Sequence, residues 1–448
     1  MEQALACLAA LRALVWGPGM TALLLGTGLW LTFRCGFPQL RLGRALRGVF
    51  TRPKEGSGLS PFQALCTALA GTVGTGNVAG VAGAILLGGP GAVFWMWVAA
   101  FFGMATKYTE IFLALRWRTH DAAGRPFGGP MVAIERGLGP RFRPLGAAFA
   151  LFGGLASFGV GNMTQSCEFT AAAGALFGIG PLPCGVLLAA LVGAVLLGGL
   201  RRIGRMTELL VPLMAGLYVL LTLPVLIAHA AELPALLRLI VRSAFSLRAA
   251  GGGACGWTLR EALRHGLSRG LFSNEAGLGS APIAHAAVEG AEPSAQARLG
   301  LVEVLIDSFG VCTLTALTVL LSGVWQEGEA AFPTAGAAAA EAFRRLLPGG
   351  LGSAGVSLCL LFFALSSILG WAWYGEVCWG WLFRESPWAR RVFRLLFPLG
   401  CLAGALGPGD LFWELADVLN GLMALPNLIG LLLLTLPHPA LDRTAARV

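Results

Sequence analysis

The segment of the chain best suited to binding chemistry is a glycine-rich stretch, residues 67–80. It reads TALAGTVGTGNVAG, with four glycines within ten residues. Each interior glycine weakens a helix by about 1 kcal/mol relative to alanine, so a helix break is predicted here. A break frees carbonyls that can ligate a hard cation, and N–H groups that can hold a carboxylate. Close helix packing through glycine is the competing interpretation.

A second segment, residues 269–281, has the same character. It reads RGLFSNEAGLGSA, so glycines again interrupt the sequence while polar residues occupy its middle. A helix broken inside a bilayer is tolerated only where protein or a watery cavity satisfies the freed backbone groups. Two such segments together favour a shared binding site over simple packing.

Composition places both segments in a membrane. The chain is 56% hydrophobic and 12% charged, whereas soluble domains are about 25% charged. Its apolar runs reach the roughly 20 residues that a helix needs to cross a bilayer. The 64 glycines are typical of helices that pack closely in lipid. The net charge of +9 lies in loops rather than in a solvated basic domain, so we expect no nucleic-acid partner.

The apolar runs predict an all-α membrane protein with eleven transmembrane helices. The predicted spans are 16–36, 61–88, 91–116, 144–177, 184–200, 207–230, 266–286, 298–323, 354–383, 391–405 and 410–436. We therefore divide the chain into an N-terminal helix with a basic cytoplasmic loop (1–60), a five-helix unit (61–230), an extracytoplasmic loop (231–265), a second five-helix unit (266–436) and a cytoplasmic tail (437–448).

Basic residues predict the orientation of these spans. Most Lys and Arg residues follow alternate spans, whereas the short opposite loops at 89–90, 178–183 and 406–409 contain none. The positive-inside rule then places the N-terminus outside and the C-terminus in the cytoplasm of a bacterial-type inner (plasma) membrane. Because the two glycine-rich spans are an odd number of spans apart, they run in opposite directions. We predict a 5+5 inverted repeat in which each unit opens with a discontinuous helix, a pattern typical of secondary transporters.

Several stretches of the chain resemble the alanine or glycine:cation symporter family, also called sodium:alanine symporters. The similar segments, spread over most of 60–430, are 67–80, 88–97, 103–110, 272–281, 370–376 and 416–428. The resemblance implies the inverted-repeat fold of the bacterial leucine transporter, preceded by one extra helix. It also implies Na⁺-driven uptake of a small neutral amino acid, with alanine, glycine and D-alanine as candidates.

The substrate site is predicted where the two broken helices face each other. We expect the substrate carboxylate to bind the N–H groups of residues 75–77, and its ammonium group to meet carbonyls freed near residues 272–274. The Gln165 amide can serve either group, although a helix–helix hydrogen bond is the alternative. Phe272 and Trp371 would cap a small pocket, unless they only pack. The predicted substrate-binding set is Thr75, Gly76, Asn77, Gln165, Phe272, Ser273, Asn274, Gly277 and Trp371.

The coupling ion is expected to be Na⁺, with no organic cofactor. Resemblance to the leucine-transporter fold suggests five ligands, which are Ala70, Val73, Phe363, Ser366 and Ser367. The first two are three residues apart, so their carbonyls align where the helix begins to unwind. The other three have i, i+3, i+4 spacing, which puts one carbonyl and two hydroxyls on one helix face. Back-bonding of the serines to the preceding turn is the alternative.

Acidic residues at membrane depth carry a further hypothesis. Buried charge is costly in a bilayer and usually functional, and the acids concerned are Glu168, Glu275, Glu303, Asp307, Glu376 and Asp417. Several should pair with Arg near the interfaces or form hydrogen bonds across helices. Glu275 and Asp307 are expected nearest to the transport path, and a proton-coupled carrier, which is the alternative function, would need one of them.

Two other classes of membrane protein fit less well. The five His residues are widely spread and show no metal spacing, and no nucleophile and base are apparent, so we do not expect an enzyme. A channel lines one continuous pore with rings of ligands, whereas paired broken helices favour alternating access. The expected partners are a small amino acid and the lipid bilayer.

Overall fold

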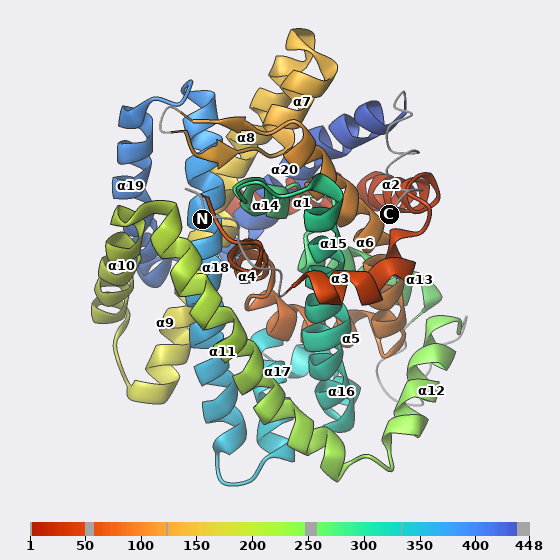
Figure 1. Cartoon of the computed structure of the whole chain (residues 1–448). Coiled ribbons are helices and arrows are strands. Elements are labelled where there is room, and N and C mark those ends of the chain that lie inside the picture. Colours follow the sequence, from red (N-terminus) through yellow and green to blue (C-terminus); the bar gives the residue numbers. More distant parts are fainter. Residues whose placement is uncertain (1, 50–57, 122–123, 247–257, 333, 437–448) are drawn as a thin grey trace.

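The chain folds into a bundle that is almost entirely helical (Figure 1). The computed structural model describes residues 2–49, 58–121, 124–246, 258–332 and 334–436. The predicted cytoplasmic tail and the centre of the predicted 231–265 loop lie outside these residues. A single two-stranded hairpin, β1 (Thr119–His120) paired with β2 (Pro126–Phe127), interrupts the helices of the described chain.

The described N-terminal region contains four helical elements, whereas the sequence predicts a single span there. Its elements are α1 (Glu2–Val15), α2 (Pro18–Arg34), η1 (Pro38–Arg41) and α3 (Leu42–Gly48). Pro18 opens α2, as expected of proline in a first helical turn. The link between α1 and α2 is only two residues long, and residues 5–34 form one candidate membrane span. We call this interrupted span the N-terminal elbow (residues 2–34).

The region predicted as the first five-helix unit begins with a broken helix. Its elements are α4 (Pro61–Thr72), η2 (Gly76–Gly80), α5 (Val81–Gly88), α6 (Gly91–Arg116), α7 (Pro130–Leu138), η3 (Pro140–Phe142), α8 (Arg143–Phe158), η4 (Gly159–Met163), α9 (Thr164–Phe177), α10 (Pro181–Leu197) and α11 (Gly199–Ala228), followed by α12 (Leu233–Ala244) in the long loop. A capping box of Ser60 and Gln63 fixes the start of α4. The helix then bends by 55° between Thr72 and Gly76, so the predicted break of the first glycine-rich segment is confirmed.

The second unit also opens with an interrupted helix. Its elements are α13 (Leu259–Asn274), α14 (Ala281–Ala286), α15 (Pro293–Val304), η5 (Leu305–Cys312), α16 (Thr313–Leu321), η6 (Val324–Glu327), η7 (Glu329–Ala331), α17 (Ala335–Leu346), α18 (Leu351–Leu382), α19 (Pro387–Leu406) and α20 (Gly409–Thr435). Residues 275–280 form the break, and they contain left-handed backbone at Glu275, Gly277 and Gly279. Glycine adopts this conformation without steric cost, which explains why the second segment unwinds here.

The helices that could cross a membrane agree in part with the predicted spans. Within the described residues, 7 helices are long and apolar enough, or 8 if α4 and its bent continuation form one span. The other predicted spans correspond to α10, which has 17 residues, to the interrupted α13–α14 pair, and to α19. The count of eleven, the inverted repeat and the domain boundaries therefore stay predictions.

Close packing brings the first break against the longest helix. In Figure 1, α18 runs through the bundle beside α4, while α10 and α19 lie together at one edge. A Cβ atom on Gly370 of α18 would come within 2.7 Å of the Gly71 nitrogen. Because no side chain separates the two backbones, the last turn of α4, just before the break, packs directly against α18.

Candidate functional site

A polar cavity lies where the two broken helices meet. Its volume is about 30 Å³, and its walls come from α4, η2, η4, α9, α13, α18 and α20. The lining residues are Gly71, Thr72, Gly74, Gly76, Asn77, Val160, Gln165, Phe272, Ser273, Glu275, Ser367, Trp371, Trp413 and Asn420. Both glycine-rich segments therefore contribute to one site, as their spacing predicts.

The first break presents backbone groups to this cavity. Asn77 closes the turn, because its side-chain Oδ1 accepts from the Gly74 N–H at 3.0 Å and its own N–H donates to the Gly74 carbonyl at 3.1 Å. The Asn77 N–H is thus engaged within the turn, which differs from its predicted role toward a carboxylate. Among the described residues the Thr75 N–H donates no hydrogen bond. Gly76 lines the cavity, and a Cβ there would meet nothing within 4 Å.

Gln165 links the opposite wall to this turn. Its Oε1 accepts from the Thr75 hydroxyl at 3.2 Å, and its Nε2 donates to the Val160 carbonyl at 3.2 Å. The side chain is buried, lines the cavity, and projects from α9 just after the π-helical turn η4. Gln165 therefore makes the interhelical hydrogen bond that was the alternative to substrate binding, and its side chain also lines the cavity.

Replacing Gln165 by Ala is expected to weaken the alanine uptake that the family resemblance implies at least tenfold, about 1.4 kcal/mol. The substitution removes a cavity-facing amide and leaves the Thr75 hydroxyl without its acceptor. The measurement is the KM and maximal rate of labelled alanine uptake, with Gln165→Glu as a shape-matched comparison. Unchanged kinetics would remove Gln165 from the site.

Some residues of the second break line the cavity, and others stabilise its unwound backbone. Phe272 and Ser273 line the cavity, whereas Asn274 and Gly277 stabilise the break itself. The Asn274 Oδ1 accepts from the Ala276 N–H at 3.0 Å. The Gly277 N–H donates to Glu110 Oε1 at 3.1 Å. The structure therefore places Asn274 and Gly277 behind the cavity wall, because the unwound backbone needs partners that replace its lost helical hydrogen bonds.

A buried carboxylate joins the two breaks. Asp307, from the π-helical turn η5, is 0% exposed and accepts from Ser273 Oγ at 3.0 Å and from Ser308 Oγ at 2.9 Å. The Asn77 amide donates to Asp307 and also to Ser273 Oγ, at 3.1 Å in the latter case. One residue of each broken helix is thus bonded to the same carboxylate. Asp307 itself lies behind the cavity-lining Asn77 and Ser273.

The residues predicted to bind the ion are brought together only in part. The Ser367 hydroxyl lines the cavity and lies 3.5 Å from the Val73 carbonyl, to which it donates. Ser366 points elsewhere, because its hydroxyl donates to the Phe363 carbonyl at 3.0 Å and lies 3.1 Å from the Met214 sulfur. Ser366 therefore hydrogen-bonds to the carbonyl of Phe363 in the preceding turn, which was the alternative to ion binding. Ala70 is fully buried and does not line the cavity.

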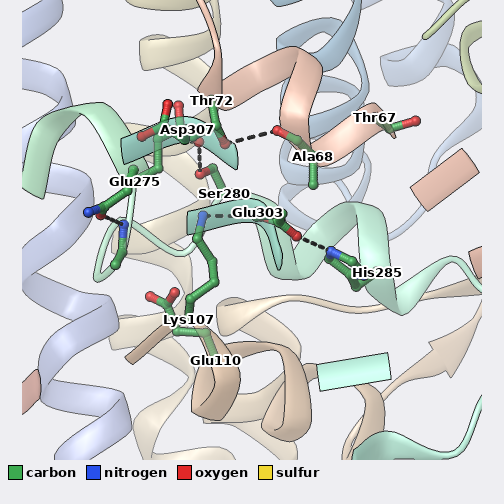
Figure 2. Close-up of polar contacts among 12 residues, drawn as sticks. Thr67, Ala68, Thr72, Lys107, Glu110, Glu275, Ser280, His285, Glu303 and Asp307 are labelled. Atoms are coloured by element: carbon green, nitrogen blue, oxygen red, sulfur yellow. Dashed lines mark hydrogen bonds and ion pairs between the residues drawn. The ribbon is translucent and has the colours of Figure 1, made fainter. Parts of the chain in front are cut away.

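Beneath the cavity lies a second set of buried polar groups that sequence reasoning did not assemble. Figure 2 shows Lys107 rising from α6 toward Glu303, which His285 approaches from the other side. The Lys107 Nζ is 3.4 Å from Glu303 Oε2, and both side chains are 0% exposed. Glu303 is also bonded to His285, whose Nδ1 lies 2.7 Å from the Gln296 amide. Lys107 therefore lies buried inside α6 and not in a basic loop.

Two other acids predicted at membrane depth pair with Arg. Glu376 accepts two hydrogen bonds from Arg394, at 2.6 and 2.9 Å. Asp417 lies 3.8 Å from Arg12. These pairs bear out the expectation that several acids meet Arg.

Several lining residues could not be assigned from spacing alone. Val160, Trp413 and Asn420 belong to helices that carry no predicted break, yet all three face the cavity. Three π-helical turns, η2, η4 and η5, surround the site, and such turns are frequent at functional sites. The only sequence signal for this third wall was the resemblance of residues 416–428, which contain Asn420.

A cavity at two helix breaks, inside a bundle of helices long and apolar enough to cross a membrane, is typical of a secondary transporter. A Na⁺-coupled sialic acid symporter has a similar fold, with a TM-score of 0.58 at 14% identity over 94% of this chain and 88% of that one. The family model described as the sodium:alanine symporter family matches residues 1–441. The chain belongs to this family.

Two relatives show how far the similarity extends. A sodium/alanine symporter of Methanococcus maripaludis is 45% identical over 435 residues, which are 95% of this chain and 93% of the relative. An amino-acid carrier protein of Bacillus subtilis is 36% identical over 416 residues, covering 92% of this chain and 86% of the relative. Similarity therefore covers nearly the whole chain, including both helix breaks.

Proposed function

We propose that the protein carries a small neutral amino acid, alanine or glycine, across the cell membrane together with Na⁺ by alternating access. The observation that carries this proposal is the single cavity shared by both broken helices. A zwitterionic substrate needs donors for its carboxylate and acceptors for its ammonium group, and an opened helix supplies both without charged side chains. The sodium/alanine symporter from Methanococcus maripaludis, at 45% identity, supports the same choice of substrate and ion.

The substrate would lie between the two breaks with its carboxylate toward the Thr75 N–H and the open face of Gly76. Its ammonium group would lie near Ser273, whose neighbour Asp307 adds negative potential. Phe272 and Trp371, which both line the cavity, would enclose the side chain. A cavity walled by two aromatic rings suits a substrate with a very short side chain.

For the ion, the proposal now rests on the Val73 carbonyl and the Ser367 hydroxyl. Replacing both Ser366 and Ser367 by Ala is expected to raise the Na⁺ concentration for half-maximal uptake at least fivefold. Ser367→Ala alone should produce nearly the whole shift, because only Ser367 faces the unwound turn. Ser366→Ala is the matched control on the same helix. An unchanged Na⁺ requirement in the double variant would exclude both serines.

The decisive experiment is uptake of labelled alanine into proteoliposomes under an imposed Na⁺ or H⁺ gradient. A Na⁺ gradient should drive accumulation, and preloaded unlabelled alanine should drive counterflow, which a channel cannot support. Accumulation driven only by a H⁺ gradient would favour the proton-coupled alternative. That alternative has one specific observation in its favour, the fully buried Asp307 carboxylate bonded only to neutral donors. We place the protein in the inner membrane with its N-terminus outside, as the basic loops predict.

A further inference from the structure

The N-terminal elbow, which lies outside the predicted ten-helix repeat, is fastened to α20 beside the cavity. The Trp16 indole N–H donates to the Asp417 carbonyl at 2.7 Å. Arg12, one helical turn earlier, pairs with Glu414 at 3.1 Å. A Cβ on Gly421 would come within 2.1 Å of Val15 and 3.0 Å of Trp16 Nε1. The elbow therefore rests directly on the α20 backbone, with Trp16 at its corner.

From this corner Trp16 reaches the cavity wall. Its ring contacts that of Phe272 edge-on, with 6.0 Å between centroids and 60° between planes, a favoured arrangement for aromatic pairs. Phe272 lines the cavity, but Trp16 does not. Trp16 therefore affects the site indirectly, through the Phe272 ring and through α20, to which it is hydrogen-bonded.

Phe272 also contacts Arg269, whose side chain has little room to move. The Arg269 guanidinium lies 5.1 Å from the centre of the Phe272 ring. A Cβ placed on Gly80 would lie only 1.5 Å from an Arg269 nitrogen, so the guanidinium occupies the space that a side chain at Gly80 would need. Because Arg269 packs against Gly80 of η2, replacing Arg269 would disturb the first break. Trp16 is therefore the better of these two Phe272 contacts to remove.

We propose that Trp16 is a positioning residue that holds Phe272 against the cavity and thereby restricts transport to small side chains. This inference rests on the proposed amino-acid transport and adds a determinant of substrate size. Without the indole, the Phe272 ring could swing toward the vacated corner and enlarge the cavity. The size limit is thus set partly by a helix that does not itself line the site.

The test compares Trp16→Ala with the wild-type protein in competition for labelled alanine uptake. Unlabelled alanine, methionine and leucine serve as competitors, and the readout is the ratio of their half-inhibitory concentrations. Trp16→Ala is expected to lower the leucine-to-alanine ratio about tenfold, which is the discrimination that one or two methylenes provide in an apolar pocket. Trp16→Phe keeps an aromatic contact without the indole N–H and should fall between the two.

A second variant tests the same inference while leaving the Trp16 indole in place. Gly421→Ala should displace the elbow from α20 and lower the ratio in the same direction, which covers the case in which Trp16→Ala does not fold. Trp30→Ala, at an exposed position on α2, is the matched control and should leave the ratio unchanged. Wild-type alanine uptake with an unaltered ratio in both Trp16→Ala and Gly421→Ala would overturn this inference alone. Absence of amino-acid uptake in the wild type would overturn the proposed function and this inference with it.

Discussion

Replacing Gly161 by Ala should reduce alanine uptake by one to two orders of magnitude. A Cβ on Gly161 would lie 2.2 Å from Trp371 Cβ and 2.4 Å from its Cγ. These atoms belong to the root of the side chain, so relief requires α18 or η4 to shift and Trp371 to move in the cavity. Overpacking of this kind costs about 1–3 kcal/mol, and a cost of that size is equivalent to roughly five- to 150-fold.

The measurement is initial uptake of labelled alanine at several concentrations, normalised to the protein recovered in the membrane. Gly216→Ala is the control, because a Cβ at Gly216 of α11 would meet nothing within 4 Å. That variant should retain wild-type transport, since the methyl group also favours the helix. Wild-type uptake by Gly161→Ala would show that Trp371 does not need this position for transport.

Replacing Lys107 by Met should destabilise the protein by about 3–5 kcal/mol, because a buried carboxylate then loses its counter-charge. The Lys107 ammonium and Glu303 are 0% exposed and 3.4 Å apart. Methionine preserves most of the apolar stem, which packs beside Gly300, so the lost charge dominates the change. The measurement is the apparent melting temperature of the purified protein in detergent, together with its yield in the membrane.

The double variant Lys107→Met, Glu303→Gln separates charge from packing. A neutral amide can still bond to His285, so we expect most of the lost stability to return. Arg344→Met is the surface control, since Arg344 is 61% exposed where it pairs with Glu341 and such pairs contribute little. Equal losses in the single and double variants would show that the ammonium group is not needed to compensate Glu303.

Much of the backbone architecture was predictable because local signals determined it. The predicted break in 67–80 lies where α4 ends and η2 begins, and the break in 269–281 lies between α13 and α14. Predicted spans such as 91–116 coincide with single helices, here α6. Glycine content, apolar length and basic loops are properties of short segments, so they can be interpreted without knowing what lies next to them.

Side-chain placement was predictable only where a break dictated it. Thr75, Gly76, Asn77, Phe272 and Ser273 lie at the two openings, as expected. Asn274 and Gly277 share the second segment but support its backbone from behind. The direction of a side chain in an unwound segment depends on its neighbours from other helices, and no periodic pattern encodes that direction.

By itself, the sequence determined a bundle of apolar helices, the location of both breaks and the family to which the chain belongs. Only the tertiary structure decided that Lys107 is buried against Glu303, that Ser367 rather than Ser366 faces the first break, and that Trp16 supports Phe272. The physical reason is the separation along the sequence of the residues that interact. Helix formation and membrane partition depend on residues a few positions apart. A buried ion pair or an aromatic support depends on distant segments that meet only when the bundle closes.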